Sequence, residues 1–322
     1  MIALVLVGSA LAVNVASREV PCPLGTGTAR VYTRVSANGA GGHDSDLAGY
    51  SSDGQWRTYR VSTCTPSLLS LYGADMDAPI PAERAAAVTA ALQKAVAALP
   101  DPGSPTPWER YGLAAAVYEA LGRDAAFLGD VWVEASWTAR DAAVGYYAGL
   151  QGPAGARALL EAGAAELSKP IAPDARKRVL YNLARVAHRG GWTAERDAWL
   201  ARFEAAGALT AREQQGLARF RHLARDVETA LQDRAIAAYT TALRGTLPYD
   251  EKVRVTYVLA DLLRRRDRPR DALPLYTLVA NDSRAPENLR SMALFLAGPL
   301  ADALDPKDRP KPAAPSTVPS AR

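Results

Sequence analysis

The chain has 322 residues, of which 48% are apolar and 22% are charged. This balance excludes an intrinsically disordered chain and allows one large or two modest globular domains with a real core. The formal net charge of +4 is small for this length and gives no support to nucleic-acid binding.

The first 16 residues, MIALVLVGSALAVNVA, are almost wholly apolar. As a helix they would be roughly 24 Å long, which is shorter than the hydrocarbon core of a membrane at about 30 Å. Small residues at 10–12 and 14–16 offer cleavage sites for a signal peptidase, although no Lys or Arg precedes Arg18. We expect a signal peptide or an uncleaved membrane anchor, and hence a periplasmic or membrane-anchored protein of the cell envelope. A buried strand or helix is the alternative.

Residues 20–75 show no helical periodicity. The stretches 28–35 and 55–64 are rich in β-branched and aromatic residues, which predicts two strands. A loop with several glycines and the run His43-Asp44-Ser45-Asp46 separates them. We therefore expect a small β subdomain over residues 20–75.

The loop between these strands holds the most polar cluster of the chain. His43, Asp44 and Asp46 have the chemistry to hold a divalent ion or to act as acid and base, which would make the protein a hydrolase or a transferase. An ordinary turn, in which Asp and Ser bond their own backbone, explains the same residues and is preferred.

Residues 80–304 are predicted to be helical throughout. Thr106, Pro107 and Glu109 form a capping box with a proline in the first turn, and Gly122 is placed to end that helix. Thr210 and Glu213 give a second capping box. Helical periodicity predicts further helices over 124–150, 153–167, 173–188, 193–206, 225–244, 253–282 (a pair) and 287–304.

The pair within residues 253–282 consists of two amphipathic helices that are too short to bury their apolar faces alone. Such a pair requires neighbours, which predicts a stacked helical array. Large and small apolar residues fall at the spacing of the tetratricopeptide motif, which this region resembles most clearly over residues 235–286. The matching positions are Leu259, Ala260, Leu263, Ala272, Tyr276 and Val279, with Ala235, Tyr239 and Ala242 one irregular repeat earlier. The predicted fold is mainly α, an irregular tetratricopeptide-like array behind a small β subdomain.

A run of five arginines lies in the turn of this helix pair, at Arg264, Arg265, Arg266, Arg268 and Arg270. These side chains could contact an anion or a partner. An exposed turn in which cations offset the dipole of the preceding helix is the preferred interpretation. No aromatic residue alternates with the arginines, which argues further against nucleic acid.

Several short motifs resemble an uncharacterised bacterial family that joins a two-knuckle CxxC zinc ribbon to tetratricopeptide-like helices. They are Val20-Pro21-Cys22-Pro23, Asp44-Ser45-Asp46-Leu47, Tyr59-Arg60-Val61-Ser62-Thr63-Cys64, Leu262-Leu263-Arg264-Arg265 and Asp271-Ala272. The resemblance covers most of residues 20–300.

The chain departs from this family where the metal would lie. Gly25 and Ser67 replace the second cysteine of each knuckle, and a structural zinc site needs four Cys or His ligands. We therefore expect neither zinc nor any other cofactor. The resemblance brings Cys22 and Cys64 together and implies a disulfide, which would stabilise the fold by about 4 kcal/mol through chain entropy. Two unpaired thiols are the alternative.

The sequence contains no recognisable catalytic or nucleotide-binding motif. We expect an exported interaction module or scaffold that holds a protein or peptide on a helical-repeat surface, rather than an enzyme. A hydrolase or transferase and a cytoplasmic zinc-ribbon adaptor remain the alternatives. Nucleic acid is not an expected partner, and a membrane is expected only through the N-terminal segment. The proline-rich tail 305–322 should be disordered.

Overall fold

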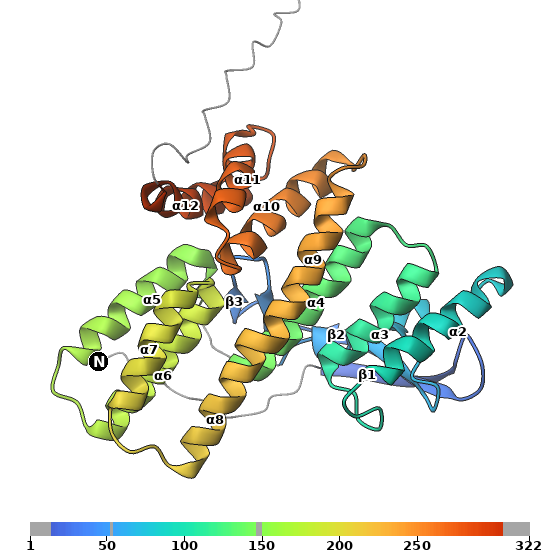
Figure 1. Cartoon of the computed structure of the whole chain (residues 1–322), viewed down its shortest axis with the longest axis horizontal. Helices are drawn as coiled ribbons and strands as arrows, with labels where there is room; N and C mark the ends of the chain where they lie inside the picture. The colour runs from blue at the N-terminus through green and yellow to red at the C-terminus, as the bar shows by residue number, and fades with distance from the viewer. Residues whose placement is uncertain (1–13, 52–53, 146–149, 305–322) are drawn as a thin grey trace, which may run out of the picture.

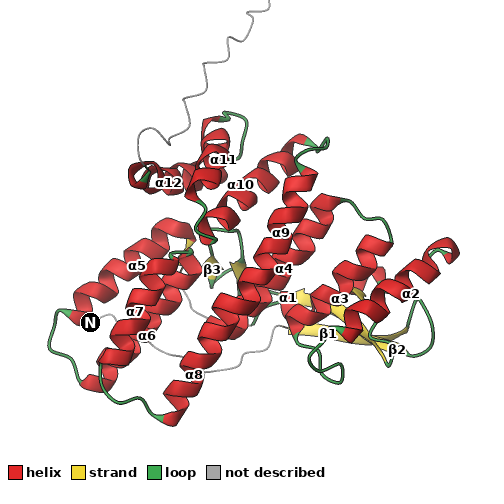
Figure 2. Ribbon diagram, in the orientation of Figure 1, coloured by secondary structure: helices red, strands yellow, loops and turns green. Residues whose placement is uncertain are grey.

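The computed structural model describes residues 14–51, 54–145 and 150–304, and it is mainly helical with a small N-terminal β region (Figures 1 and 2). This confirms the predicted fold class. Most of the predicted signal segment and the whole predicted tail 305–322 lie outside the described residues, but residues 14–16 begin strand β1 (Asn14–Pro21). No helix in the described part of the chain has both the length and the hydropathy needed to cross a membrane.

Four strands form an antiparallel sheet in the order β1, β2 (Thr28–Ser36), β5 (Val61–Thr65) and β6 (Ser70–Tyr72). Ala29 and Val31 of β2 are buried and their neighbours are not, so one face of the sheet packs on the helices. A disulfide joins Cys22, which follows β1, to Cys64 in β5, as predicted. Because the two sulfur atoms are bonded to each other, they provide no thiolate ligands for zinc.

The predicted strand over 55–64 is wrong in its first half, where α1 (Arg57–Arg60) forms a single helical turn. Tertiary contacts explain the difference. The buried Arg57 side chain binds both carboxylate oxygens of Asp141, at 2.6 and 2.8 Å. The Tyr111 hydroxyl donates to the Arg57 carbonyl at 2.9 Å.

The helices follow the predicted order closely. Both capping boxes form, with Thr106 and Glu109 at the start of α3 and with Thr210 and Glu213 at the start of α8. After α1, the helices up to residue 242 are α2 (Ala82–Ala97), α3 (Pro107–Ala120), α4 (Ala125–Val144), α5 (Gly152–Leu167), α6 (Pro173–Gly190), α7 (Thr193–Ala205), α8 (Ala211–His222) and α9 (Glu228–Ala242). The last three are α10 (Tyr249–Arg265), α11 (Pro269–Asn281) and α12 (Glu287–Ala303).

Helices α8 and α9 were predicted as separate elements, but the π-helical segment η2 (Leu223–Val227) joins them into one long helix (Figure 1). This helix lies along α4 over the length of α9. The Tyr239 ring lies against the α4 backbone at Gly129, where an added Cβ would be 2.3 Å from the ring. The predicted repeat residue Tyr239 therefore packs on α4.

Three groups of buried side chains make up the core. One lies between the sheet and α2 to α4, the second within α5 to α8, and the third between α4 and α9 to α12. The predicted helix pair α10 and α11 is confirmed, since Leu259, Leu263, Ala272, Tyr276 and Val279 are all buried in the third group.

The loop between β2 and α1 leaves the sheet and enters the helical part of the chain. Its short strands β3 (Gly42–His43) and β4 (Gly49–Tyr50) pair with each other, and β3 also pairs in parallel with β7 (Leu150–Gln151), just before α5. Figure 1 shows β3 in the middle of the molecule, among helices from both halves of the chain. Residues 42–50 thus belong to the helical core, although they were predicted within the β subdomain.

Candidate functional site

Two features that looked separate in the sequence meet in the structure. Asp44 and Asp46 from the loop are buried, and so are Arg264 and Arg265 at the end of α10. Ser45 Oγ accepts hydrogen bonds from Arg264 Nη2 at 3.0 Å and from Arg265 Nη2 at 2.7 Å. The loop does form a turn bonded to its own backbone, because Ala48 N donates to Asp46 Oδ1 at 3.4 Å and Leu47 N to the Asp44 carbonyl at 3.2 Å. The preferred interpretation of an exposed turn is wrong for Arg264 and Arg265, which are buried.

Asp44 is bound by two arginines from different helices. Its carboxylate accepts from Arg140 Nη1 of α4 at 3.0 Å and from Arg189 Nε of α6 at 2.7 Å. The Tyr50 hydroxyl donates to it at 2.9 Å, and the Arg189 guanidinium lies 3.8 Å from the Tyr50 ring centroid. The loop is therefore fixed to both helices through one carboxylate.

Asp46 shares Arg140 with Asp44. It accepts from Arg140 Nη1 at 3.0 Å and Nη2 at 2.6 Å, and from the Trp137 indole at 3.0 Å. Complete burial opposes ionisation of Asp46, but the charges of Arg140 and Arg265 outweigh it and hold the pKa of Asp46 well below its usual range. Asp46 is thus a buried carboxylate anion.

Asp261 pairs with both arginines at the end of its own helix, α10. It accepts from Arg264 Nη2 at 2.7 Å, from Arg265 Nε at 2.6 Å and from the Tyr276 hydroxyl of α11 at 2.7 Å. Although burial opposes its ionisation, the two arginines lower the pKa of Asp261. The Ser45 hydroxyl also donates to Asp261, which closes the link to the loop.

The same two arginines bind the last carbonyl groups of α6. Arg264 donates to the carbonyls of Gly190 at 2.8 Å and Gly191 at 3.0 Å, while Arg265 donates to those of Arg189 at 2.7 Å and His188 at 3.2 Å. These carbonyls lie at the C-terminus of α6 and carry its partial negative charge, and the His188 carbonyl also accepts from Gly191 N at 3.0 Å. The arginines thus lie in the last turn of their own helix α10, as expected, and in addition offset the dipole of α6.

Glu228 of α9 completes the charge balance. Its carboxylate accepts from Arg140 Nε at 2.9 Å and Nη2 at 2.7 Å, and from Gln232 Nε2 at 2.8 Å. Burial opposes ionisation, but Arg140 and the hydrogen bond from His188 lower the pKa of Glu228 to about 2.

His188 is buried, although the sequence analysis did not place it at any site. Burial is the largest influence and lowers the pKa of His188, so the ring is neutral at pH 7. Its Nε2 lies 2.8 Å from Glu228 Oε2, and its Nδ1 lies 3.4 Å from Arg196 Nη1. A neutral ring that donates from Nε2 to Glu228 and accepts at Nδ1 from Arg196 satisfies both neighbours.

Four carboxylates and four guanidinium groups therefore form one buried ion-pair network whose formal charges cancel. The members are Asp44, Asp46, Asp261, Glu228, Arg140, Arg189, Arg264 and Arg265. They come from the loop and from α4, α6, α9 and α10. Because each charge has lost its hydration, removing one member leaves partners uncompensated in the core.

The other predicted site residues lie at the surface or near it. Arg266 pairs with Asp233 at 2.8 Å and Arg268 with Asp271 at 2.7 Å. Arg270 is exposed in the first turn of α11, and His43 is half-buried beside Gly152 at the start of α5. The structure therefore divides both predicted clusters between the core and the periphery.

This arrangement holds the loop in place and leaves its carboxylates no access to a substrate. Within the described ranges, no group of three or more His, Cys, Asp or Glu side chains is placed to hold a metal ion. The carboxylate groups of Asp44 and Asp46 are buried and accept hydrogen bonds from arginines. The geometry therefore does not favour the hydrolase or transferase hypothesis.

Comparisons with protein-family models, with curated proteins and with solved structures found no match. The resemblance to the zinc-ribbon family therefore stays a prediction. The network residues that the sequence analysis missed are Arg140, Arg189, Glu228 and Asp261. A signal for Arg140 exists, because it continues the buried stripe Val133, Ser136 and Val144 of α4, where an unpaired charge would be costly.

The network predicts a large effect of removing its shared arginine. Replacing Arg140 by Met should lower the free energy of unfolding by about 3–5 kcal/mol, because three buried carboxylates lose a partner. Arg221→Met is the matched control, since Arg221 also makes a two-pronged ion pair, with Glu204, but at the surface. Its loss should cost at most about 1 kcal/mol. Urea unfolding of both variants measures the difference, and equal small losses would contradict a buried network.

The close approach of α6 and α10 predicts that Gly191 cannot carry a side chain. Gly191 has a φ of 74°, and an added Cβ would lie 2.6 Å from Arg264 Nη2 and 2.7 Å from Arg265 Cγ. Gly25 has a similar φ of 80° with nothing within 4 Å of an added Cβ, so Gly25→Ala isolates the backbone strain.

We expect Gly25→Ala to destabilise by about 1–2 kcal/mol and Gly191→Ala by roughly 2 kcal/mol more, because two network arginines must move. Thermal or urea unfolding measures both. Equal losses in the two variants would show that the arginines are not held against the α6 terminus.

Proposed function

We propose that the chain is an exported interaction module that binds a protein partner through the last two helices of its helical array. The observation that carries the proposal is the outer surface of α11 and α12, which we call the terminal face. It includes Leu278 of α11 and Leu294 and Phe295 of α12, and these residues are 60%, 68% and 38% exposed. Among the described residues, the one other large apolar side chain this exposed is Val35, on β2.

The terminal face differs from the usual end of a helical array. The last helix of such an array normally has a polar outer face, which keeps the protein soluble. Here the 11 residues from Ser291 to Ala301, which all lie within α12, include no charged side chain. The inner side of α12 is already filled, because Leu289, Met292 and Leu296 pack into the core. Leu294 and Phe295 are thus left for an external contact.

The chemistry of this face points to a protein partner with an apolar surface of its own, such as an amphipathic helix that adds to the array. An uncharged apolar face gains little from a charged ligand and most from the burial of matching apolar side chains. Gly298 lies one helical turn after Leu294 and Phe295. It is exposed, and a Cβ added there would meet nothing within 4 Å, so a partner helix could approach closely. A second copy of this chain is the other possible occupant, and the experiment separates the two.

The proposal includes export because of the disulfide. Cys22 and Cys64 are bonded across 42 residues, and such structural disulfides persist in oxidising compartments. The apolar N-terminal stretch supports the same location.

The terminal face can be tested by photocrosslinking in intact cells. A photoreactive amino acid at Ser291, on the exposed side of α12, should give a crosslink to a different protein, and Leu294→Ser with Phe295→Ser should remove that crosslink. Val35→Ser is the matched control, because it also removes an exposed apolar side chain and should leave the crosslink intact. A crosslink to a second copy of the chain, or one that survives the double substitution, would overturn the proposal.

Export can be tested with the cysteines. When intact cells are quenched with acid and the unfolded chain is treated with a maleimide, neither cysteine should be labelled until a reductant is added. The Cys22→Ser variant, which frees Cys64, is the positive control for labelling. Labelling of both cysteines before reduction would place the protein in a reducing compartment.

A further inference from the structure

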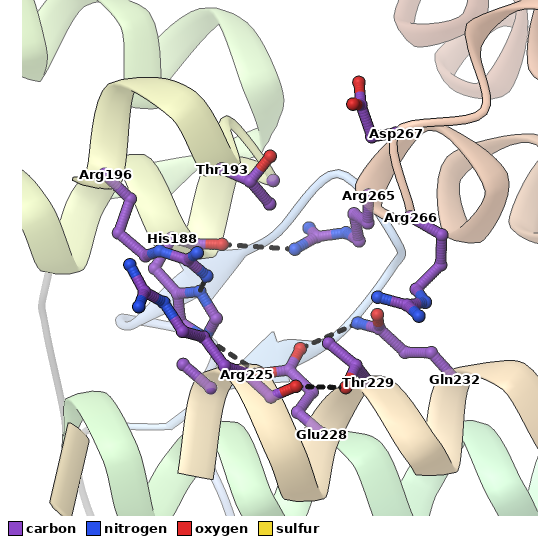
Figure 3. Close-up of a pocket in the computed structure, with 12 residues that line it drawn as sticks. His188, Thr193, Arg196, Arg225, Glu228, Thr229, Gln232, Arg265, Arg266 and Asp267 are labelled. Atoms are coloured by element: carbon purple, nitrogen blue, oxygen red, sulfur yellow. Dashed lines mark hydrogen bonds and ion pairs between the residues drawn. The ribbon is translucent and has the colours of Figure 1, made fainter. Parts of the chain in front are cut away.

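A cavity of about 420 Å³ lies beside the ion-pair network, where the turn between α6 and α7, the segment η2 with α9, and the end of α10 meet (Figure 3). Four arginines line it, from three of these elements. Figure 3 shows Arg196 and Arg225 on one side and Arg265 and Arg266 on the other. We call this space the arginine cavity.

Two of these arginines share one surface carboxylate. Arg196 Nε donates to Asp197 at 2.8 Å, and Arg225 Nη2 lies 3.0 Å from the other oxygen of the same group. One carboxylate therefore faces two guanidinium groups, which leaves one positive charge in excess. Each guanidinium has five N–H donors, and the contacts with Asp197 and His188 leave several of them for a ligand.

The remaining charges at the cavity do not cancel this excess. Glu228 lines the cavity, but its negative charge is balanced by the ion pair with Arg140 in the network. Arg265 is balanced by Asp261, and Arg266 by Asp233. The Asp267 side chain lies at the rim and points away from the cavity in Figure 3.

The buried lining groups are held in position before any ligand arrives. The side chains of Arg196, His188 and Gln232 are buried, and Glu228 holds the last two by hydrogen bonds of 2.8 Å each. His188 in turn accepts from Arg196. A preformed cationic cavity of this volume is the size of a small-molecule site, and guanidinium groups bind phosphate and carboxylate oxygens in two-pronged geometry.

We propose that the arginine cavity binds a small molecule that carries an oxyanion group, either a phosphate or a carboxylate. Arg225 and Arg266 close the cavity from opposite sides and contact the ligand, while Arg196 contributes the excess charge. This site is separate from the terminal face and does not depend on the function proposed for it.

Titration calorimetry on the full chain tests the site, with inorganic phosphate and succinate as probes and sodium chloride at matched ionic strength as the blank. We expect saturable binding of at least one probe with one site per chain, weakened as salt is added. Binding of phosphate alone identifies a phosphate ligand, and binding of succinate alone a carboxylate ligand.

Arg225→Gln and Arg266→Gln should each weaken the binding of that probe by tenfold or more. Arg268→Gln is the matched control, because Arg268 lies two residues from Arg266 in an exposed ion pair with Asp271 and outside the cavity. It should change the affinity less than twofold, and unfolding curves show that the variants remain folded. Failure of both probes to bind, or binding that neither cavity variant weakens, would overturn the proposal.

Discussion

The structure depends on the buried ion pairs that join residues 42–50 to α4, α6 and α10, and α4 to α9. Arg140 alone contacts Asp44, Asp46 and Glu228, and so it connects the loop to both α4 and α9. An array of amphipathic helices can slide in register at little cost, because apolar contacts have no direction. Ion pairs in a dry interior tolerate no such shift, since a displaced charge stays buried and unpaired. We infer that the network selects one arrangement of the helices.

The parts of the fold that the sequence predicted are those governed by local chemistry. The capping boxes at Thr106 and Thr210 involve residues three apart, and α3 and α8 begin where these boxes predicted. Apolar periodicity likewise placed α10 and α11 and named their buried residues. The disulfide was implied by a family resemblance rather than by local chemistry, yet Cys22 and Cys64 are joined.

The missed features depend on partners that are distant in sequence. Ser45 and Arg265 are 220 positions apart, and an arginine run or an Asp-Ser-Asp loop looks solvated until its partner is known. The one-turn helix at Arg57 has the same origin, because Asp141 of α4 fixes the side chain. The continuous α8–α9 helix was missed because a π-helical segment, Leu223–Val227, replaces the turn that a repeat would contain.

The network also explains why a cationic cavity can exist in a helical array. Guanidinium groups placed together repel each other, and their long side chains are costly to order. Here contacts with the core already order two of these side chains. Glu228 orients His188, which accepts a hydrogen bond from Arg196, and Asp261 fixes Arg265. Arg265 thus serves the network and the cavity wall at once. The charges that hold the helices in register therefore also fix the inner wall of the cavity, against which the more exposed Arg225 and Arg266 would hold an anion.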